Sequence, residues 1–158
     1  MKTAKGITLV ELIVVVAIIT TLLAIAFSFQ GWIRRYNIER TVREIHADLL
    51  MARQKALSEN RVYCVSFTQN SYTIKGDFDP PPDGDSDCND ANDRTIVQKS
   101  LSYNLDNNLS NTFNFQKDGL SNKEGKIWIN EKAYMNCIDI YYTRLNLGVW
   151  NGSECIAK

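Results

Sequence analysis

The sequence is poor in the residues that build catalytic and zinc sites. His46 is the only histidine in 158 residues, and none of the four cysteines forms a Cys-x-x-Cys pair. A tetrahedral zinc site needs several such ligands at short spacings. A lone histidine provides no Ser/His/Asp set for nucleophilic catalysis, and no glycine-rich phosphate loop is present. We therefore do not expect this chain to be an enzyme.

A net charge is also lacking, because 18 basic residues balance 18 acidic ones. Seven aspartates fall within residues 77–93, a stretch with no basic residue. The rest of the range 61–158 carries 10 basic and 6 acidic residues, which is only a mild excess. A nucleic-acid-binding surface is typically far more basic. We do not expect a nucleic acid partner.

One segment has no charge at all. Residues 12–33 form an uncharged run of 22, and about 20 apolar residues suffice to cross a bilayer as a helix. Lys2 and Lys5 precede it. Two ordinary interpretations apply: a plain membrane anchor, or a secretory signal peptide cleaved after the small residues of 24–26.

Glu11, at the start of this run, fits neither interpretation. An acid at the centre of a membrane helix costs on the order of 2.5–3.5 kcal/mol, and intramembrane acids are by default functional residues with a partner. The octapeptide KGITLVEL, residues 5–12, resembles the cleavage motif of type IV prepilins and pseudopilins. Most members of that family have Phe at the first mature position, where this chain has Ile7.

The resemblance implies a role for each residue of the motif. A prepilin peptidase would cut after Gly6 and methylate the new N-terminus at Ile7. Glu11 would then be the fifth residue of the mature chain, where the family's acid pairs with the N-terminal amine of a neighbouring subunit in the filament. Two buried opposite charges are tolerated when they are paired, whereas one left alone is penalised.

The helical pattern continues beyond the apolar run. Apolar residues recur at spacings of four and three, which indicates one buried stripe on a helix from about residue 8 to 59. We expect this stripe to pack against the chain's own globular head. No proline falls between Met1 and Asp79, which favours a pseudopilin or minor pilin over a major pilin. The stripe consists of Ile38, Val42, Ile45, Leu49, Ala52 and Ala56.

The remainder, residues 61–158, is rich in short runs of aromatic and β-branched residues, as strands require. We predict an α+β fold in which a long N-terminal membrane-spanning helix packs on a C-terminal antiparallel β-sheet domain. The predicted strands are residues 61–67, 71–75, 95–101, 111–115, 125–130, 137–143 and 147–151.

The junction between helix and strands narrows the resemblance. Residues 49–67, LLMARQKALSENRVYCVSF, are similar to the same region of the pseudopilin H and minor pilin FimT/FimU group. That group has an A-R-x-x-A segment there, matched by Ala52, Arg53 and Ala56.

The acidic stretch 77–93 has two interpretations. Asp83, Asp85 and Asp87 alternate like the first ligands of an EF-hand, but Cys88 replaces the loop's glycine and an arginine replaces its glutamate, which excludes that motif. An irregular Ca²⁺ loop remains a hypothesis, since some pseudopilins bind calcium. The simpler interpretation is a solvated loop, because the stretch is polar and rich in proline.

The four cysteines allow three disulfide connectivities, and the sequence does not choose among them. We favour Cys64 with Cys88 and Cys137 with Cys155, which would tie the acidic stretch to the first strand and close the final strands. An exported domain permits such bonds, and each contributes roughly 2–4 kcal/mol.

Together these features predict a leader at 1–6, a membrane and filament-core helix at 7–33, an amphipathic helix at 34–60, and a β-rich head at 61–158. The resemblance implies a minor pilin or pseudopilin in the bacterial inner membrane with a periplasmic head. Its partners would be prepilin peptidase, other pilin or pseudopilin subunits and the inner-membrane assembly platform. The alternatives are a major pilus subunit, a DNA-binding minor pilin, and an anchored binding module that never polymerises.

Overall fold

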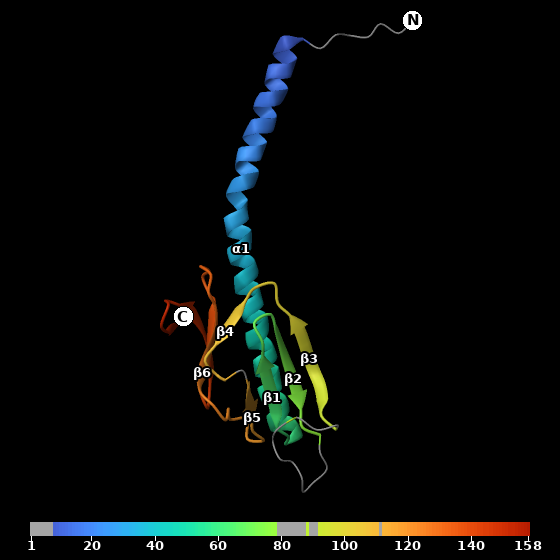
Figure 1. Ribbon diagram of the computed structural model, residues 1–158, viewed down its shortest axis with the longest axis vertical. Helices are drawn as coiled ribbons and strands as arrows, with labels where there is room; N and C mark the ends of the chain where they lie inside the picture. Colours follow the sequence, from blue (N-terminus) through green and yellow to red (C-terminus); the bar gives the residue numbers. More distant parts are fainter. Residues whose placement is uncertain (1–7, 79–87, 89–91, 111) are drawn as a thin grey trace, which may run out of the picture. The chain divides into compact units, whose positions relative to one another are not determined.

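Figure 1 shows the computed structural model of the chain. The chain divides into two compact units, Met1–Arg35 and Tyr36–Lys158. The residues it describes are 8–78, 88, 92–110 and 112–158.

One helix precedes all the strands: α1 spans Leu9–Glu59. The strands of the described residues form two antiparallel sheets, one ordered β3-β2-β1-β5 and the other β4-β6-β7-β8-β9. Their bounds are β1 Tyr63–Phe67, β2 Ser71–Gly76, β3 Arg94–Ser100, β4 Leu105–Asn107, β5 Thr112–Phe115, β6 Gly125–Ile129, β7 Cys137–Ile140, β8 Leu145–Trp150 and β9 Cys155–Ala157.

The predicted α+β class, a long apolar helix followed by antiparallel strands, is confirmed. The strands differ in detail. Strands β4 and β9 have three residues each, which is too short to leave a periodic pattern in the sequence. The predicted strand 137–143 ends at Ile140, because Tyr141 N donates to Arg144 O at 2.9 Å and the chain turns there.

The amphipathic half of α1 supplies the centre of the core. All six residues of the predicted stripe are at most 2 % exposed, and they form one cluster with apolar side chains of both sheets. Figure 1 shows these turns of the helix behind β1 and β2. The stripe therefore packs against the head of its own chain, as predicted, because a helix with apolar residues every three to four positions must cover that face.

The helix ends at Asn60, which adopts a left-handed conformation with φ of 52°. Arg61 N donates to Ala56 O at 3.2 Å, and this bond from the second residue past the cap satisfies a terminal carbonyl. Asparagine tolerates this backbone region better than most residues. The chain reverses here and enters β1 three residues later.

Strand β1 is the central connection between α1 and the first sheet. Its side chains alternate, with Tyr63, Val65 and Phe67 buried and the intervening residues half-buried. Val65 is in register with Ile74 of β2 and Phe113 of β5, so each row of the sheet presents apolar groups to the helix. The opposite face of this sheet is polar.

Asn136 holds the second sheet together just before β7. The side chain is 4 % exposed, and its Nδ2 donates to Glu131 O at 2.7 Å and to Ile129 O at 3.3 Å. Its Oδ1 accepts from Trp150 N at 2.7 Å. One buried amide therefore bonds to backbone groups from both neighbouring segments.

A charged network links the first sheet to α1. Tyr72 OH donates to Asp48 Oδ2 at 2.5 Å, and Lys99 Nζ donates to the same atom and to Glu44 Oε1, both at 2.7 Å. Burial, and then the bond to Asp48, raises the pKa of the Tyr72 hydroxyl well above its ordinary value. The bonds to Asp48 and then Glu44 raise the pKa of Lys99.

We predict that Asn136→Ala lowers the free energy of unfolding by about 2–3 kcal/mol, because it removes the three hydrogen bonds that this buried amide makes. Asn130→Ala is the matched control at an exposed site and should change stability by less than about 0.5 kcal/mol. Urea unfolding of the full chain in detergent micelles measures both. Equal effects of the two substitutions would contradict the role assigned to Asn136.

We predict that Tyr72→Phe costs about 1–2 kcal/mol at pH 7, where it removes the bond to Asp48. Because the folded pKa of Tyr72 is raised, its stabilisation is full below the unfolded value near pH 10 and is lost as the pH rises. The difference between wild type and Tyr72→Phe should therefore shrink above pH 10. Tyr142→Phe, at a residue 51 % exposed, is the control. A gap that stays constant from pH 7 to 11 would rule out this linkage.

Candidate functional site

The candidate site begins in the first turn of α1. Glu11 N donates to Thr8 Oγ1 at 3.3 Å, and Leu12 N donates to Thr8 O at 3.2 Å, so Thr8 caps the helix. Glu11 is exposed in this turn, where the positive end of the helix dipole favours a carboxylate. No ion pair to Glu11 is found within the described residues.

Two threonines of the apolar run that follows bond to the helix backbone. Thr20 Oγ1 donates to Ala17 O at 3.0 Å, and Thr21 Oγ1 donates to Ile18 O at 2.8 Å. Every backbone and hydroxyl group of a membrane helix needs such an internal partner, because lipid offers none. Within the described residues, α1 is the helix long and apolar enough to cross a membrane, judged by length and composition.

Several predicted site residues lie outside the described residues. Gly6 and Ile7 precede them, and Asp83, Asp85 and Asp87 fall in the gap between 78 and 88. Among the residues that the structure does describe, no group of three or more acidic, histidine or cysteine side chains could hold a metal ion. Cleavage, methylation and calcium binding therefore stay predictions.

The cysteines pair as Cys64–Cys88 and Cys137–Cys155, with Cα–Cα distances of 6.1 and 5.9 Å. This is the pairing that the sequence analysis favoured among three. The first bond ties β1 to the connection between β2 and β3. The second joins β7 to β9 across β8, and it passes Gly148, where a Cβ atom would lie 2.9 Å from Cys155 Sγ.

The sequence analysis did not predict that two arginines contact Phe78, which lies near the start of the acidic stretch; we call this contact the clamp of Arg61 and Arg94. The guanidinium carbons of Arg61 and Arg94 each lie 4.9 Å from the centre of the Phe78 ring. Arg61 Nη1 also donates to Asp77 O at 3.3 Å. Cation–π contacts of this kind contribute about 0.5–1 kcal/mol each at exposed sites. Only a fold that brings the starts of β1 and β3 together could reveal the cluster, because 32 positions separate the two arginines.

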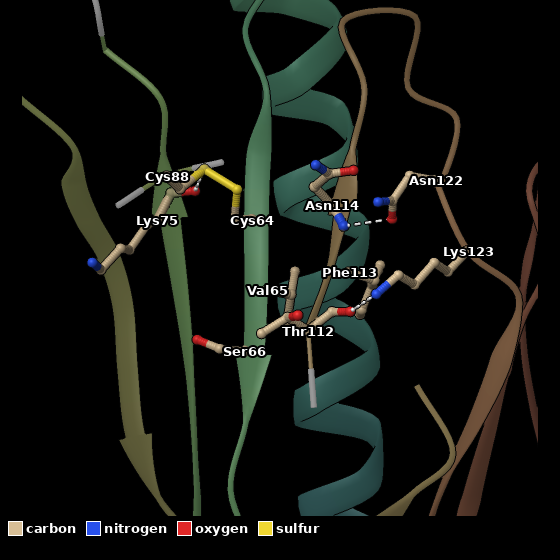
Figure 2. Close-up of a pocket in the computed structure, with 10 residues that line it drawn as sticks. All are labelled: Cys64, Val65, Ser66, Lys75, Cys88, Thr112, Phe113, Asn114, Asn122 and Lys123. Atoms are coloured by element: carbon tan, nitrogen blue, oxygen red, sulfur yellow. Dashed lines mark hydrogen bonds between the residues drawn. A yellow bond between two sulfur atoms is a disulfide. The ribbon is translucent and has the colours of Figure 1, made fainter. Parts of the chain in front are cut away.

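A polar groove lies on the face of the first sheet that points away from α1. Figure 2 shows it running over β1 and β5, with the Cys64–Cys88 disulfide at one side and the segment of Asn122 and Lys123 at the other. Its volume is about 340 Å³. Lys123 Nζ donates to Thr112 O at 3.0 Å, and Asn114 N donates to Asn122 Oδ1 at 2.8 Å (Figure 2).

A long N-terminal helix that begins with an acid and an uncharged apolar run, and whose second half forms the core of an antiparallel head, defines a pilin-like protein. Residues 1–27 match the family model described as the prokaryotic N-terminal methylation motif. Residues 41–140 match the model described as type II transport protein GspH. The chain belongs to this GspH family. A search of curated proteins and a search of solved structures each gave no significant match.

Proposed function

We propose that this protein is a minor pilin or pseudopilin, a structural subunit of a type IV pilus or a type II secretion pseudopilus. The observation that carries the proposal is the pair of family matches, one to the methylation motif at the N-terminus and one to GspH over the head. The GspH family consists of structural subunits rather than enzymes, which agrees with the lack of a catalytic set in the sequence.

The N-terminal residues supply the assembly mechanism. Prepilin peptidase cuts between Gly6 and Ile7 and methylates the Ile7 amine, which leaves Glu11 as the fifth residue. The helix anchors the subunit in the inner membrane, with the head in the periplasm. On the assembly platform the carboxylate of Glu11 pairs with the N-terminal amine of a neighbouring subunit.

Physical chemistry supports a partner for Glu11. The residue precedes a run of 22 side chains that carry no charge, so it is the costly group in that segment. A neighbour's amine offsets that cost only when the two helices are in one axial register. The pair therefore selects a single stagger between subunits, while the apolar surfaces alone would tolerate several.

We predict that the mature protein from its host membranes begins at methylated Ile7, as intact mass and N-terminal sequencing would show. Gly6→Leu should leave the leader attached, because the peptidase then meets a side chain at the cut. Gly31→Ala is the matched control, since a Cβ atom there meets nothing within 4 Å. A chain that begins at Phe27 would identify a secretory signal peptide, and an uncut chain a plain anchor. Either result overturns the proposal.

We predict that Glu11→Leu is processed and retained in membranes like wild type but is depleted more than tenfold from isolated filaments or pseudopili. The substitution removes the acid that selects the register and leaves membrane insertion intact. Glu39→Gln is the control: it breaks only the helix-surface pair with Arg43, whose atoms lie 2.8 Å apart. Normal incorporation of Glu11→Leu would favour an anchored binding module that does not polymerise.

A further inference from the structure

The two disulfides lie in different surroundings, and the first one borders open space. Cys64 is half-buried, Cys88 is 4 % exposed, and both residues line the groove. Figure 2 shows both sulfur atoms at the groove's edge. A cavity of about 340 Å³ in contact with the bond is large enough to admit a small thiol or the tip of a protein loop.

Charge does not explain a difference between the two bonds. Lys75 and Lys123 line the groove, but the ammonium of Lys75 extends away from the two sulfur atoms in Figure 2, and Lys123 Nζ donates to Thr112 O. Cys88 also lies in the sequence stretch 77–93, which carries seven aspartates. Access to the sulfur atoms therefore distinguishes this bond, because the rate of exchange depends on access as well as on the pKa of the thiols.

The second bond is enclosed. Cys137 is fully buried and Cys155 is 8 % exposed. Trp128 is the register partner of Cys137, and Trp150 is the partner of Cys155. The two indole rings stack with their centres 4.2 Å apart and their planes 10° from parallel. The aromatic pair therefore flanks the disulfide, while the backbone of Gly148 lies against its sulfur.

The bonds also differ in what they hold. Strands β2 and β3 are paired along their length, so opening Cys64–Cys88 leaves the first sheet intact and releases only the link between β1 and the β2–β3 connection. Opening Cys137–Cys155 would leave the three-residue β9 attached by backbone bonds to β8 alone. Short terminal strands fray easily without such a link.

We propose that Cys64–Cys88 is a thiol–disulfide exchange site that a dithiol reductant opens while Cys137–Cys155 stays closed. A thiolate of the reductant attacks Cys64 Sγ, the S–S bond breaks, and Cys88 leaves as a thiolate that takes a proton from solvent. The second thiol of the reductant then attacks the mixed disulfide and releases Cys64. Two electrons pass from the dithiol, which becomes a disulfide, to the two cysteines. The reaction reverses with an oxidised dithiol, so the acidic stretch has a covalent tether to β1 that can be opened and closed.

The test is timed reduction of the purified full chain in detergent micelles. Dithiothreitol is one reductant, and a small Cys-x-x-Cys protein is the other. Samples are alkylated at intervals, and mass spectrometry gives the labelled fraction of each cysteine. Cys64 and Cys88 should be labelled at least tenfold faster than Cys137 and Cys155, with no change in circular dichroism. Equal rates, faster labelling of Cys137 and Cys155, or labelling only as the chain unfolds would overturn the proposal.

Three variants assign the cause of the difference. Lys75→Gln, in the groove, and Lys117→Gln, at an exposed site outside it, should both leave the rate of reduction of Cys64–Cys88 unchanged, because access sets that rate. Trp128→Ala should speed reduction of Cys137–Cys155 and leave the other bond unaffected. Slower reduction in Lys75→Gln alone, or no effect of Trp128→Ala, would overturn access as the cause. These readouts need neither leader cleavage nor filament assembly, so they fail or succeed independently of the proposed function.

Discussion

The head depends on the burial of one apolar stripe along the second half of α1. The six residues of this stripe are at most 2 % exposed. They form one continuous apolar cluster with side chains from both sheets. Two of the six are Ala52 and Ala56, whose small side chains let the strands approach the helix backbone closely. Because apolar burial contributes about 25 cal/mol per Å², a stripe shared by two sheets stabilises each sheet as well as the helix.

The polar features are arranged around that line. The Tyr72–Asp48–Lys99 network lies beside it and ties β2 and β3 to the helix through a carboxylate that two donors share. In the second sheet, Asn136 links neighbouring segments through hydrogen bonds to backbone groups rather than through charges. Apolar contact sets the overall packing, whereas these directional bonds fix which strand lies opposite which.

The sequence predicted what depends on local periodicity and missed what depends on long-range contact. The helix and its stripe follow from spacings of three and four residues, and the fold class follows from β-rich runs after residue 60. The sequence leaves three cysteine pairings open, and the one favoured, which ties the acidic stretch to the first strand and closes the final strands, is the one in the structure. The clamp of Arg61 and Arg94 on Phe78, and the need for glycine at Gly148, could not be predicted, since each requires strands that are distant in sequence to be neighbours. The division into two sheets was missed because β4 has only three residues.

Glu11 sets a different kind of constraint from the core of the head. A buried stripe tolerates conservative apolar changes, because many contacts share its energy. A single acid beside an uncharged run of 22 residues has no such redundancy: its cost in a membrane depends on whether one opposite charge reaches it. The chain thus combines a head specified by many weak contacts with an N-terminal segment whose chemistry rests on one ionisable group.

Both disulfides join residues of the strand region, with sequence separations of 24 and 18, and neither reaches into α1. Covalent closure of the head is therefore a local event that involves only residues after the helix. The two bonds therefore fix the strand region within itself, whereas non-covalent contacts hold that region against the helix: the apolar cluster and the bonds of Tyr72 and Lys99 to Asp48. A change that weakens the stripe on α1 would therefore release the helix from a strand region that stays cross-linked.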